Sequence, residues 1–342
     1  MNGIDLYDGI VLHQGDCRDI MRSLPADHFD AVITDPPYGI SFAGEKWDTA
    51  TPVGFESWAQ SWGEEALRVI KPGGYLLAFS ATRTYHRLTS GLEDAGFEVR
   101  DAMAWIRADG KPAGMDLSSA FDRAAGVLDQ REGRDVRAIN VTNAATGMAS
   151  RDVKNAGTPI RDEAKEWEGW GVGLKPAWEP IVVARRPLEG RLVDNVREHG
   201  TGAMNIRAGM DAVGGSYPPN LLMGEEAMSA AVEQGAPDHV WPVFRYQPKA
   251  PTSERPKVGG VQHVTVKPLE LMRYLIRLVV KPGSLILEPF AGSGTTLQAA
   301  AMENVRAVGC ELDDRYIPLI RERFKHGIEA PLDLFALGGD AA

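Results

Sequence analysis

The sequence has few of the residues that build disulfide frameworks and metal centres. It contains two cysteines in 342 residues, Cys17 and Cys310, and these give neither a disulfide framework nor the spacing of a zinc site. Its seven histidines are scattered along the chain, so we expect no metal site. Because so little cysteine is typical of a reducing compartment, we expect the protein to work in the cytoplasm.

Long apolar runs are also missing. No run is long enough to span a bilayer, and the first residues lack the basic-then-apolar pattern of a signal peptide. We therefore expect no association with membranes. The apolar content of 44% and the charged content of 25% are typical of a globular protein. The length is enough for one large α/β domain with an insertion, or for two domains.

An excess of positive charge is missing too, since the formal net charge is −10. Binding to nucleic acid phosphates requires Lys and Arg, so the distribution of charge matters more than its total. Residues 243–281 carry eight basic and two acidic residues, a balance of +6, whereas residues 188–242 carry three basic and eight acidic ones, a balance of −5. The first segment can face phosphates, and an ordinary solvated surface is the alternative.

One short stretch combines a strand pattern with unusual polar groups. Residues 30–34 are mostly apolar and β-branched, which predicts a buried strand, and the strand pattern ends at Asp35-Pro36-Pro37-Tyr38. Prolines cannot donate ladder hydrogen bonds, so the chain leaves the sheet rigidly. The Asp35 carboxylate and the Pro36 carbonyl can accept hydrogen bonds from the amino group of a base, while Tyr38 stacks on its ring. A stiff turn without chemistry is the alternative.

A second stretch, residues 285–296, combines a strand pattern with two glycines, Gly292 and Gly294. Glycines let the backbone turn tightly against a ligand, and no Lys follows them, which argues against a nucleoside-triphosphate loop. Acids stand at four predicted strand ends, namely Asp16, Asp35, Glu288 and Glu311. Ligands of open α/β sheets bind at such carboxyl ends. Several acidic side chains close together would repel a triphosphate, but they suit a ligand with a sulfonium, an ammonium and ribose hydroxyls.

Together, the two stretches resemble the catalytic and cofactor motifs of amino-methylating DNA methyltransferases. These enzymes use S-adenosylmethionine to modify adenine N6 or cytosine N4. The order of the motifs, with the catalytic one first, resembles the circularly permuted β group of the family. The stretch from Asp35 to Asp48, DPPYGISFAGEKWD, is especially similar to phage and prophage members.

The resemblance implies roles for individual residues. It places the catalytic groups at Asp35, Pro36, Pro37 and Tyr38. It places cofactor contacts at the following positions: Asp16, Lys267, Pro268, Glu270, Glu288, Phe290, Gly292, Ser293, Gly294, Thr295 and Glu311. Within this set Asp16 is expected near the adenine amino group, residues 264–270 against the methionine part and Phe290 packed on the cofactor. Glu311 lies 23 residues after Glu288, near the spacing at which an acid meets ribose hydroxyls.

Alternating strand and helix patterns predict a Rossmann-like, doubly wound α/β sheet that is mostly parallel. Two interruptions carry no sustained sheet pattern, and the resemblance assigns them to DNA recognition. The expected division is as follows: 1–107, catalytic half; 108–175, insertion for DNA recognition; 176–187, return strand; 188–262, insertion for target recognition; 263–330, cofactor half; 331–342, tail. Trp58 and Trp62 recur at helical spacing and are expected in the core, and residues 41–51 are expected to form a loop beside the site.

The predicted function is site-specific methylation of adenine N6 in double-stranded DNA, with the target base flipped out of the duplex. Adenine is preferred because the family tends to pair an Asp before Pro-Pro-Tyr with adenine and a Ser with cytosine. Cytosine N4 remains the alternative, as does a catalytically silent DNA-binding module of the same fold. A nicotinamide-dependent dehydrogenase is the competitor on fold alone, but it leaves the prolines and Tyr38 without a role. The resemblance leaves the choice between monomer and homodimer open.

Overall fold

The computed structural model describes residues 3–40, 48, 51–106, 115–133, 157–174, 176–212, 217–224, 229, 232–233, 235, 243–244 and 250–325. Its centre is a ten-stranded mixed sheet. In spatial order the strands are β1 (Ile4–Tyr7), β2 (Ile10–Gln14), β12 (Arg306–Glu311), β11 (Leu285–Glu288), β3 (Phe29–Thr34), β4 (Ile70–Phe79), β6 (Trp178–Arg185), β5 (Glu98–Ile106), β7 (Leu221–Gly224) and β8 (Val243–Phe244). Strands β9 (Lys257–Val258) and β10 (Val261–Gln262) form a separate hairpin.

The sheet is mostly parallel, as the sequence predicts. Strands β2, β12, β11, β3 and β4 all run in one direction. Strand β6 runs antiparallel to both of its neighbours, β4 and β5. Because of this reversal, the first residues of β6 lie at the same edge of the sheet as the last residues of β3 and β11.

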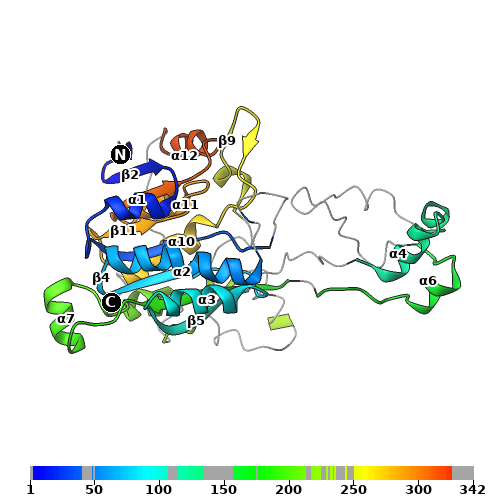
Figure 1. Ribbon diagram of the computed structural model, residues 1–342, viewed down its shortest axis with the longest axis horizontal. Helices are drawn as coiled ribbons and strands as arrows, with labels where there is room; N and C mark the ends of the chain where they lie inside the picture. The colour runs from blue at the N-terminus through cyan, green and yellow to red at the C-terminus, as the bar shows by residue number, and fades with distance from the viewer. Residues whose placement is uncertain are drawn as a thin grey trace, which may run out of the picture.

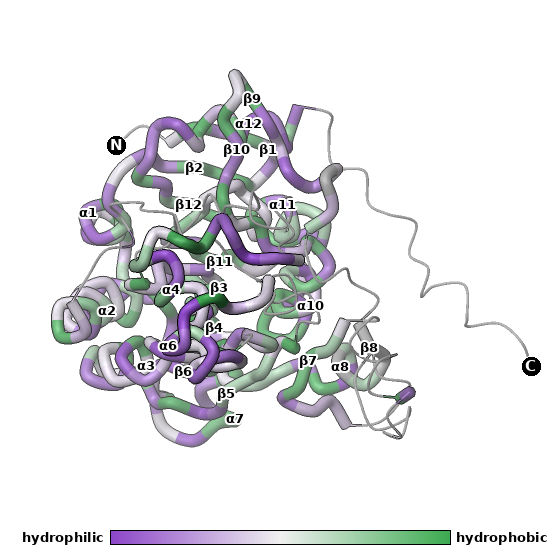
Figure 2. Tube along the Cα trace, turned by 90° about the vertical axis from the view of Figure 1, so that its right-hand side faces the viewer, coloured by the Kyte–Doolittle hydropathy of each residue, from purple (hydrophilic) through white to green (hydrophobic). Residues whose placement is uncertain are grey.

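Helices cover both faces of the sheet, which makes it doubly wound (Figure 2). One face carries α1 (Cys17–Ser23), α2 (Pro52–Val69) and α3 (Tyr85–Asp94), and the other carries α10 (Leu269–Val279), α11 (Thr295–Met302) and α12 (Ile317–Phe324). Side chains of β3 alternate between the two cores, with Val32 packed on the α2 side and Ile33 on the α10 side. Trp62 of α2 is fully buried, as expected. No helix that the structure describes is long and apolar enough to cross a membrane.

The boundary between α2 and β4 differs from the sequence prediction. Lys71-Pro72-Gly73-Gly74 is expected to end the helix ahead of a strand at residue 75, but β4 already begins at Ile70. An irregular ladder explains the difference, because the β4 partner shifts from Ile70 to Tyr75 between Phe29 and Ala31 of β3. An irregular ladder can accommodate a proline, which has no N–H to donate.

The second predicted interruption, residues 188–262, contains more regular structure than expected. It includes α7 (Leu192–His199), α8 (Ile206–Ala212), η5 (Thr252–Glu254) and the short strands β7 to β10. The two helices are too short for periodicity to reveal them. Asn195 of α7 is fully buried and donates to the Pro72 carbonyl at 3.0 Å, so a hydrogen bond rather than an apolar face fixes this helix on β4.

The first interruption contains a projecting arm. Helices α4 (Leu117–Ala124), η3 (Leu128–Gln130) and α6 (Asp162–Glu166) belong to it, and α4 and α6 lie far from the sheet (Figure 1). The sequence of this interruption also predicts a helix near residues 117–125 and a polar tract with Arg131, Arg134, Arg137, Arg151 and Arg161; α4 confirms the helix. A buried ion pair holds the arm together, with Arg131 Nε 2.7 Å from Asp122 Oδ2. Arg131 therefore has a structural role; Arg134, Arg137 and Arg151 of the same predicted tract lie outside the described residues.

Candidate active site

Strand pairing brings the two predicted motifs together. In the parallel ladder of β3 and β11, Ala31 faces Ile286 and Val32 faces Leu287. The strand ends are therefore level, and the Thr34 hydroxyl donates a hydrogen bond to the Glu288 carboxylate across the ladder. The end of β12 lies beside the end of β2, because Gly15 N–H donates to the Glu311 carbonyl at 2.8 Å. All four predicted acids thus follow or end neighbouring strands at one edge of the sheet.

Asp35 forms the centre of a compact polar cluster. Its Oδ1 accepts a hydrogen bond from the Tyr38 hydroxyl at 2.8 Å, and its Oδ2 lies 2.6 Å from Lys267 Nζ. Lys267 Nζ also donates to the Tyr38 hydroxyl at 3.0 Å. Burial and the neighbouring carboxylates raise the pKa of Tyr38 well above its usual range, so the phenol keeps its proton. Lys267, expected among the cofactor contacts, is bonded to the predicted catalytic residues.

Asp48 fixes the turn that follows Asp35. Its carboxylate is 1% exposed and accepts hydrogen bonds from the backbone N–H groups of Tyr38 at 2.6 Å, Gly39 at 2.7 Å and Ile40 at 3.3 Å. These amides follow two prolines and leave the sheet, so the ladder cannot satisfy them. Asp48 ends the DPPYGISFAGEKWD stretch quoted above. The rest of the expected loop, 41–47 and 49–50, lies outside the described residues.

Replacing Asp48 with alanine is expected to lower the free energy of unfolding by about 2–4 kcal/mol, because three backbone N–H groups lose their acceptor. Chemical denaturation measures this loss. Asp48→Asn keeps one acceptor oxygen in place and is the matched control, with a smaller expected loss. Equal stability of the alanine variant and the original protein would contradict this role.

The glycine loop after β11 turns sharply and is held from two sides. Gly292 and Gly294 have φ values of +54° and +81°, in the left-handed region that favours glycine. Gly292 N–H donates to Glu311 Oε2 at 2.7 Å. Arg323 of α12 donates to the side-chain oxygens of Ser293, at 3.2 Å, and Thr295, at 3.0 Å. The loop is therefore preformed, with both hydroxyls engaged by Arg323.

Burial shifts the titration of two of the strand-end acids. It raises the pKa of Glu288 from 4.5 to about 8 and that of Glu311 from 4.5 to about 7. Glu288 is 1% exposed and, besides Thr34, accepts the Phe290 N–H at 3.0 Å. Glu311 accepts N–H groups from Gly292 and Asp313, which partly offset the cost of its charge.

The raised pKa of Glu311 predicts a pH-dependent stability. Between pH 4.5 and about 7 the folded protein holds the Glu311 proton while the unfolded chain has lost it, so the free energy of unfolding falls as pH rises. The full loss, up to about 3 kcal/mol, is reached above the folded pKa. Denaturation curves from pH 4 to 8 should show this fall together with the one that the raised pKa of Glu288 causes, and Glu311→Gln should remove the Glu311 part of the slope. A slope that the substitution leaves unchanged would assign the effect to another group.

The remaining predicted residues lie in different surroundings. Asp16 caps α1 and forms an ion pair with Arg18 at 2.6 Å. The Phe290 ring packs 5.5 Å from Trp58 and 5.4 Å from Trp62, centroid to centroid. Pro268 is the N-cap of α10. Glu270 points to Arg273 at 2.7 Å and joins none of the other predicted site residues; its contact with a cofactor stays a prediction.

Sequence reasoning missed three residues at the site. Glu179 Oε2, at the start of β6, lies 3.2 Å from the Tyr38 hydroxyl and 3.5 Å from Lys267 Nζ. His263 packs on Tyr316 at 4.3 Å between centroids and lies against Gly292, where a Cβ would stand 3.1 Å from Nε2. Asp48 is the third. Glu179 could have been predicted at this edge only if β6 were known to run antiparallel to its neighbours. A local sequence pattern does not show the direction of a strand.

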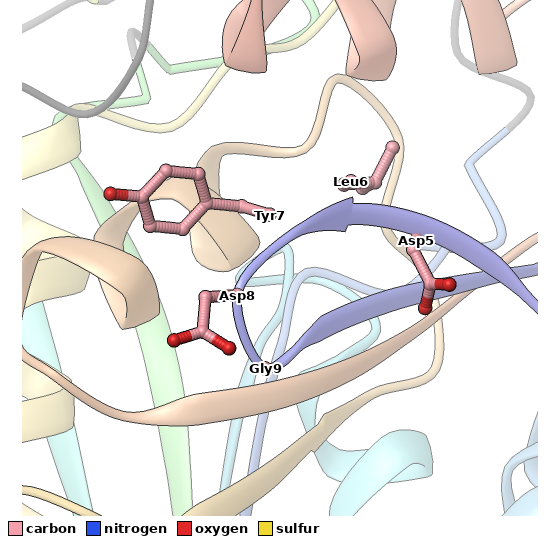
Figure 3. A pocket seen from close by; sticks show the side chains of 5 residues that line it. All are labelled: Asp5, Leu6, Tyr7, Asp8 and Gly9. Atoms are coloured by element: carbon pink, nitrogen blue, oxygen red, sulfur yellow. The ribbon is translucent and has the colours of Figure 1, made fainter.

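The basic segment 243–281 is partly neutralised within the molecule where the structure describes it, while Lys257 and Lys281 are exposed. Arg273 pairs with Glu270 and Glu303, Arg277 lies 3.5 Å from Glu303, and Lys267 is buried. Arg245 and Lys249 lie outside the described residues. A hollow at the β1–β2 hairpin, lined by Asp5, Leu6, Tyr7, Asp8 and Gly9, contains none of the predicted site residues (Figure 3).

Comparisons with known proteins agree with this arrangement. A family model described as DNA methylase matches residues 29–322, most of the chain. The chain is 28% identical over 315 residues to the type II methyltransferase M.HindIII of Haemophilus influenzae, covering 90% of this chain and 81% of that protein.

A solved structure of the PvuII enzyme shows the same fold. The cytosine-N4-specific PvuII DNA methyltransferase aligns with a TM-score of 0.52 and 16% identity, covering 92% of this chain and 86% of that chain. A complex of M1.HpyAVI with SAM aligns with a TM-score of 0.48 and 16% identity over 92% of this chain and 98% of that one. With its fold and with the family model matched over most of its length, the chain belongs to the N6/N4 DNA methylase family.

Proposed function

We propose that this protein transfers a methyl group from S-adenosylmethionine to adenine N6 in duplex DNA, acting on a base flipped out of the helix. One observation carries the proposal: Asp35 and the Gly292–Gly294 loop end adjacent parallel strands, so an amino group at Asp35 and a ligand at the loop lie at the same edge. Membership of the DNA methylase family supports the reaction class.

The residues at the glycine loop fit S-adenosylmethionine. The positive-φ glycines let the backbone turn sharply at this edge, and a ligand with a positive sulfur and an ammonium group would favour the charged forms of Glu288 and Glu311, whose pKa values are raised by burial. Glu311 uses each oxygen for one backbone N–H, which leaves further acceptor positions for ribose hydroxyls.

The mechanism depends on how the chain presents the amino group. When bound, S-adenosylmethionine supplies a methyl group on a positively charged sulfur, which makes that methyl electrophilic. The amino nitrogen of a base is a poor nucleophile because its lone pair is conjugated with the ring. Hydrogen bonds from the amino group to Asp35 and to the Pro36 carbonyl favour a more tetrahedral nitrogen, whose lone pair is then available. Alignment of the reacting atoms gives much of the acceleration, and no covalent enzyme intermediate is required.

Adenine is the proposed base because the motif begins with Asp rather than Ser, and in this family Asp tends to be paired with adenine. Cytosine N4 is the second candidate, since the PvuII enzyme of similar fold is cytosine-N4-specific. Its amino group makes the same hydrogen bonds to Asp35.

We propose that the insertions 108–175 and 188–262 contact the DNA. The described part of the arm, residues 115–133 and 157–174, has four basic and eight acidic residues, so phosphate neutralisation is not its main contribution. It exposes Trp170 by 61% and Leu174 by 92%, which suits apolar contacts with sugars and bases.

Expression in a methylation-free host, followed by methylome sequencing and nucleoside mass spectrometry, tests the function. N6-methyladenine at one recurring sequence is the expected result. Detection of N4-methylcytosine instead would show that the target base is cytosine, with the proposed methyl-transfer reaction unchanged. Unmodified DNA from cells with folded, cofactor-binding protein would favour a silent DNA-binding module.

A further inference from the structure

Glu179 joins Asp35, Tyr38 and Lys267 in a four-residue cluster drawn from three parts of the chain. Lys267 Nζ lies 2.6 Å from Asp35 Oδ2 and 3.5 Å from Glu179 Oε2. The Tyr38 hydroxyl lies 2.8 Å from Asp35 Oδ1 and 3.2 Å from Glu179 Oε2. The two carboxylates therefore flank the same ammonium and the same phenol.

Within these four residues, two carboxylates lie near the same ammonium. All three charged side chains are poorly solvated, with exposures of 9% for Lys267, 20% for Asp35 and 16% for Glu179. The Phe79 ring closes one side, its centroid 4.8 Å from Lys267 Nζ. An ammonium so little exposed is stable only next to a carboxylate. If it leaves Asp35, it therefore needs another one.

A target base has to share Asp35 with two donors that are already bonded to it. Both oxygens of this carboxylate already accept a hydrogen bond, one from Lys267 and one from Tyr38. The amino group of a base is a neutral donor, which makes a weaker bond to a carboxylate than an ammonium does. Moving Lys267 toward Glu179, already 3.5 Å away, frees Asp35 Oδ2 without leaving the ammonium unpaired.

On the basis of the proposed function, we propose that Glu179 is a positioning residue for methyl transfer. It retains the Lys267 ammonium while the amino group of the target base takes its place at Asp35. Glu179 thus acts on the base through Lys267. The antiparallel direction of β6 explains why a strand-start residue occupies this position, since Phe79 at the end of β4 faces Ile181 near the start of β6.

A double-mutant cycle tests this inference. Single-turnover methyl transfer is measured for the original protein, Glu179→Gln, Lys267→Met and the double variant, with S-adenosylmethionine affinity and thermal unfolding as checks. We expect Glu179→Gln to lower the rate about tenfold or more at unchanged cofactor affinity. In the Lys267→Met background the same substitution should cost less than about twofold. Glu179→Asp should restore part of the rate, and Glu93→Gln, at an exposed position of α3, is the matched control.

The outcomes separate this inference from the function on which it rests. If Glu179→Gln lowers the transfer rate equally in the original protein and in Lys267→Met, Glu179 does not act through Lys267. If Glu179→Gln transfers at the original rate, Glu179 has no positioning role. If Lys267→Met transfers too slowly to follow, the cycle is measured on the Kd of a target duplex with saturating cofactor product, where the same coupling is expected. An original protein that methylates no DNA would overturn the proposed function, and this inference with it.

Discussion

Asp35→Ala is expected to lower the single-turnover rate of methyl transfer by at least about a thousandfold, while the Kd for S-adenosylmethionine changes less than about twofold. The carboxylate is the acceptor proposed for the amino group, and alanine offers no replacement. In the part of the chain that the structure describes, no hydrogen bond links Asp35 to Glu311 or to the glycine loop. Cofactor binding should therefore be retained. Transfer of a labelled methyl group and calorimetric titration of the cofactor measure the two effects.

The fold should tolerate this substitution. Lys267 keeps Glu179 Oε2 at 3.5 Å as a partner, so its ammonium does not become an unpaired buried charge. Asp5→Ala, at an exposed aspartate of β1 in the hollow of Figure 3, is the control and should transfer at the original rate. If Asp35→Ala methylates DNA as fast as that control, the assignment of the catalytic carboxylate is wrong.

Local pattern was enough to predict the strand ends that make this site. Residues 30–34 and 285–287 are short apolar runs with a defined end, and both end at the edge where the cofactor and base are expected. The parallel ladder that brings them together, with Ile286 facing Ala31, confirms the mostly parallel sheet. Such runs are read reliably because burial on both faces requires them to be apolar throughout.

The missed features depend on contacts between distant segments. Glu179 joins the Asp35 cluster because β6 is reversed, and the direction of β6 depends on the connection through residues 108–177, whose sequence has no sustained sheet pattern. Lys267 was expected at the cofactor, but the geometry pairs it with Asp35, 232 positions earlier in the chain. Arg131 was expected in a polar tract for DNA, and it is buried against Asp122. A single charged residue in a sequence does not show whether its partner is solvent or a carboxylate.

Gly292→Val is expected to weaken S-adenosylmethionine binding by about a hundredfold or more, through backbone strain and lost space. At φ +54° a β-branched residue is strongly disfavoured, and the new Cβ would stand 3.1 Å from His263 Nε2. Moving the loop to relieve this contact would also disturb the Gly292 N–H bond to Glu311, which lies at 2.7 Å. Calorimetric titration of the cofactor measures the loss directly.

Gly259→Val separates strain from position. Gly259 has nearly the same backbone conformation, φ +57°, and no atom lies within 4 Å of where its Cβ would stand. Gly259→Val should therefore lose stability through backbone strain alone and keep its cofactor affinity, whereas Gly292→Val should lose more stability and also its cofactor affinity. Asp35→Ala is expected to lose methyl transfer and keep cofactor binding, whereas Gly292→Val is expected to lose cofactor binding itself. Equal cofactor affinity of the two glycine variants would place the cofactor away from the loop after β11.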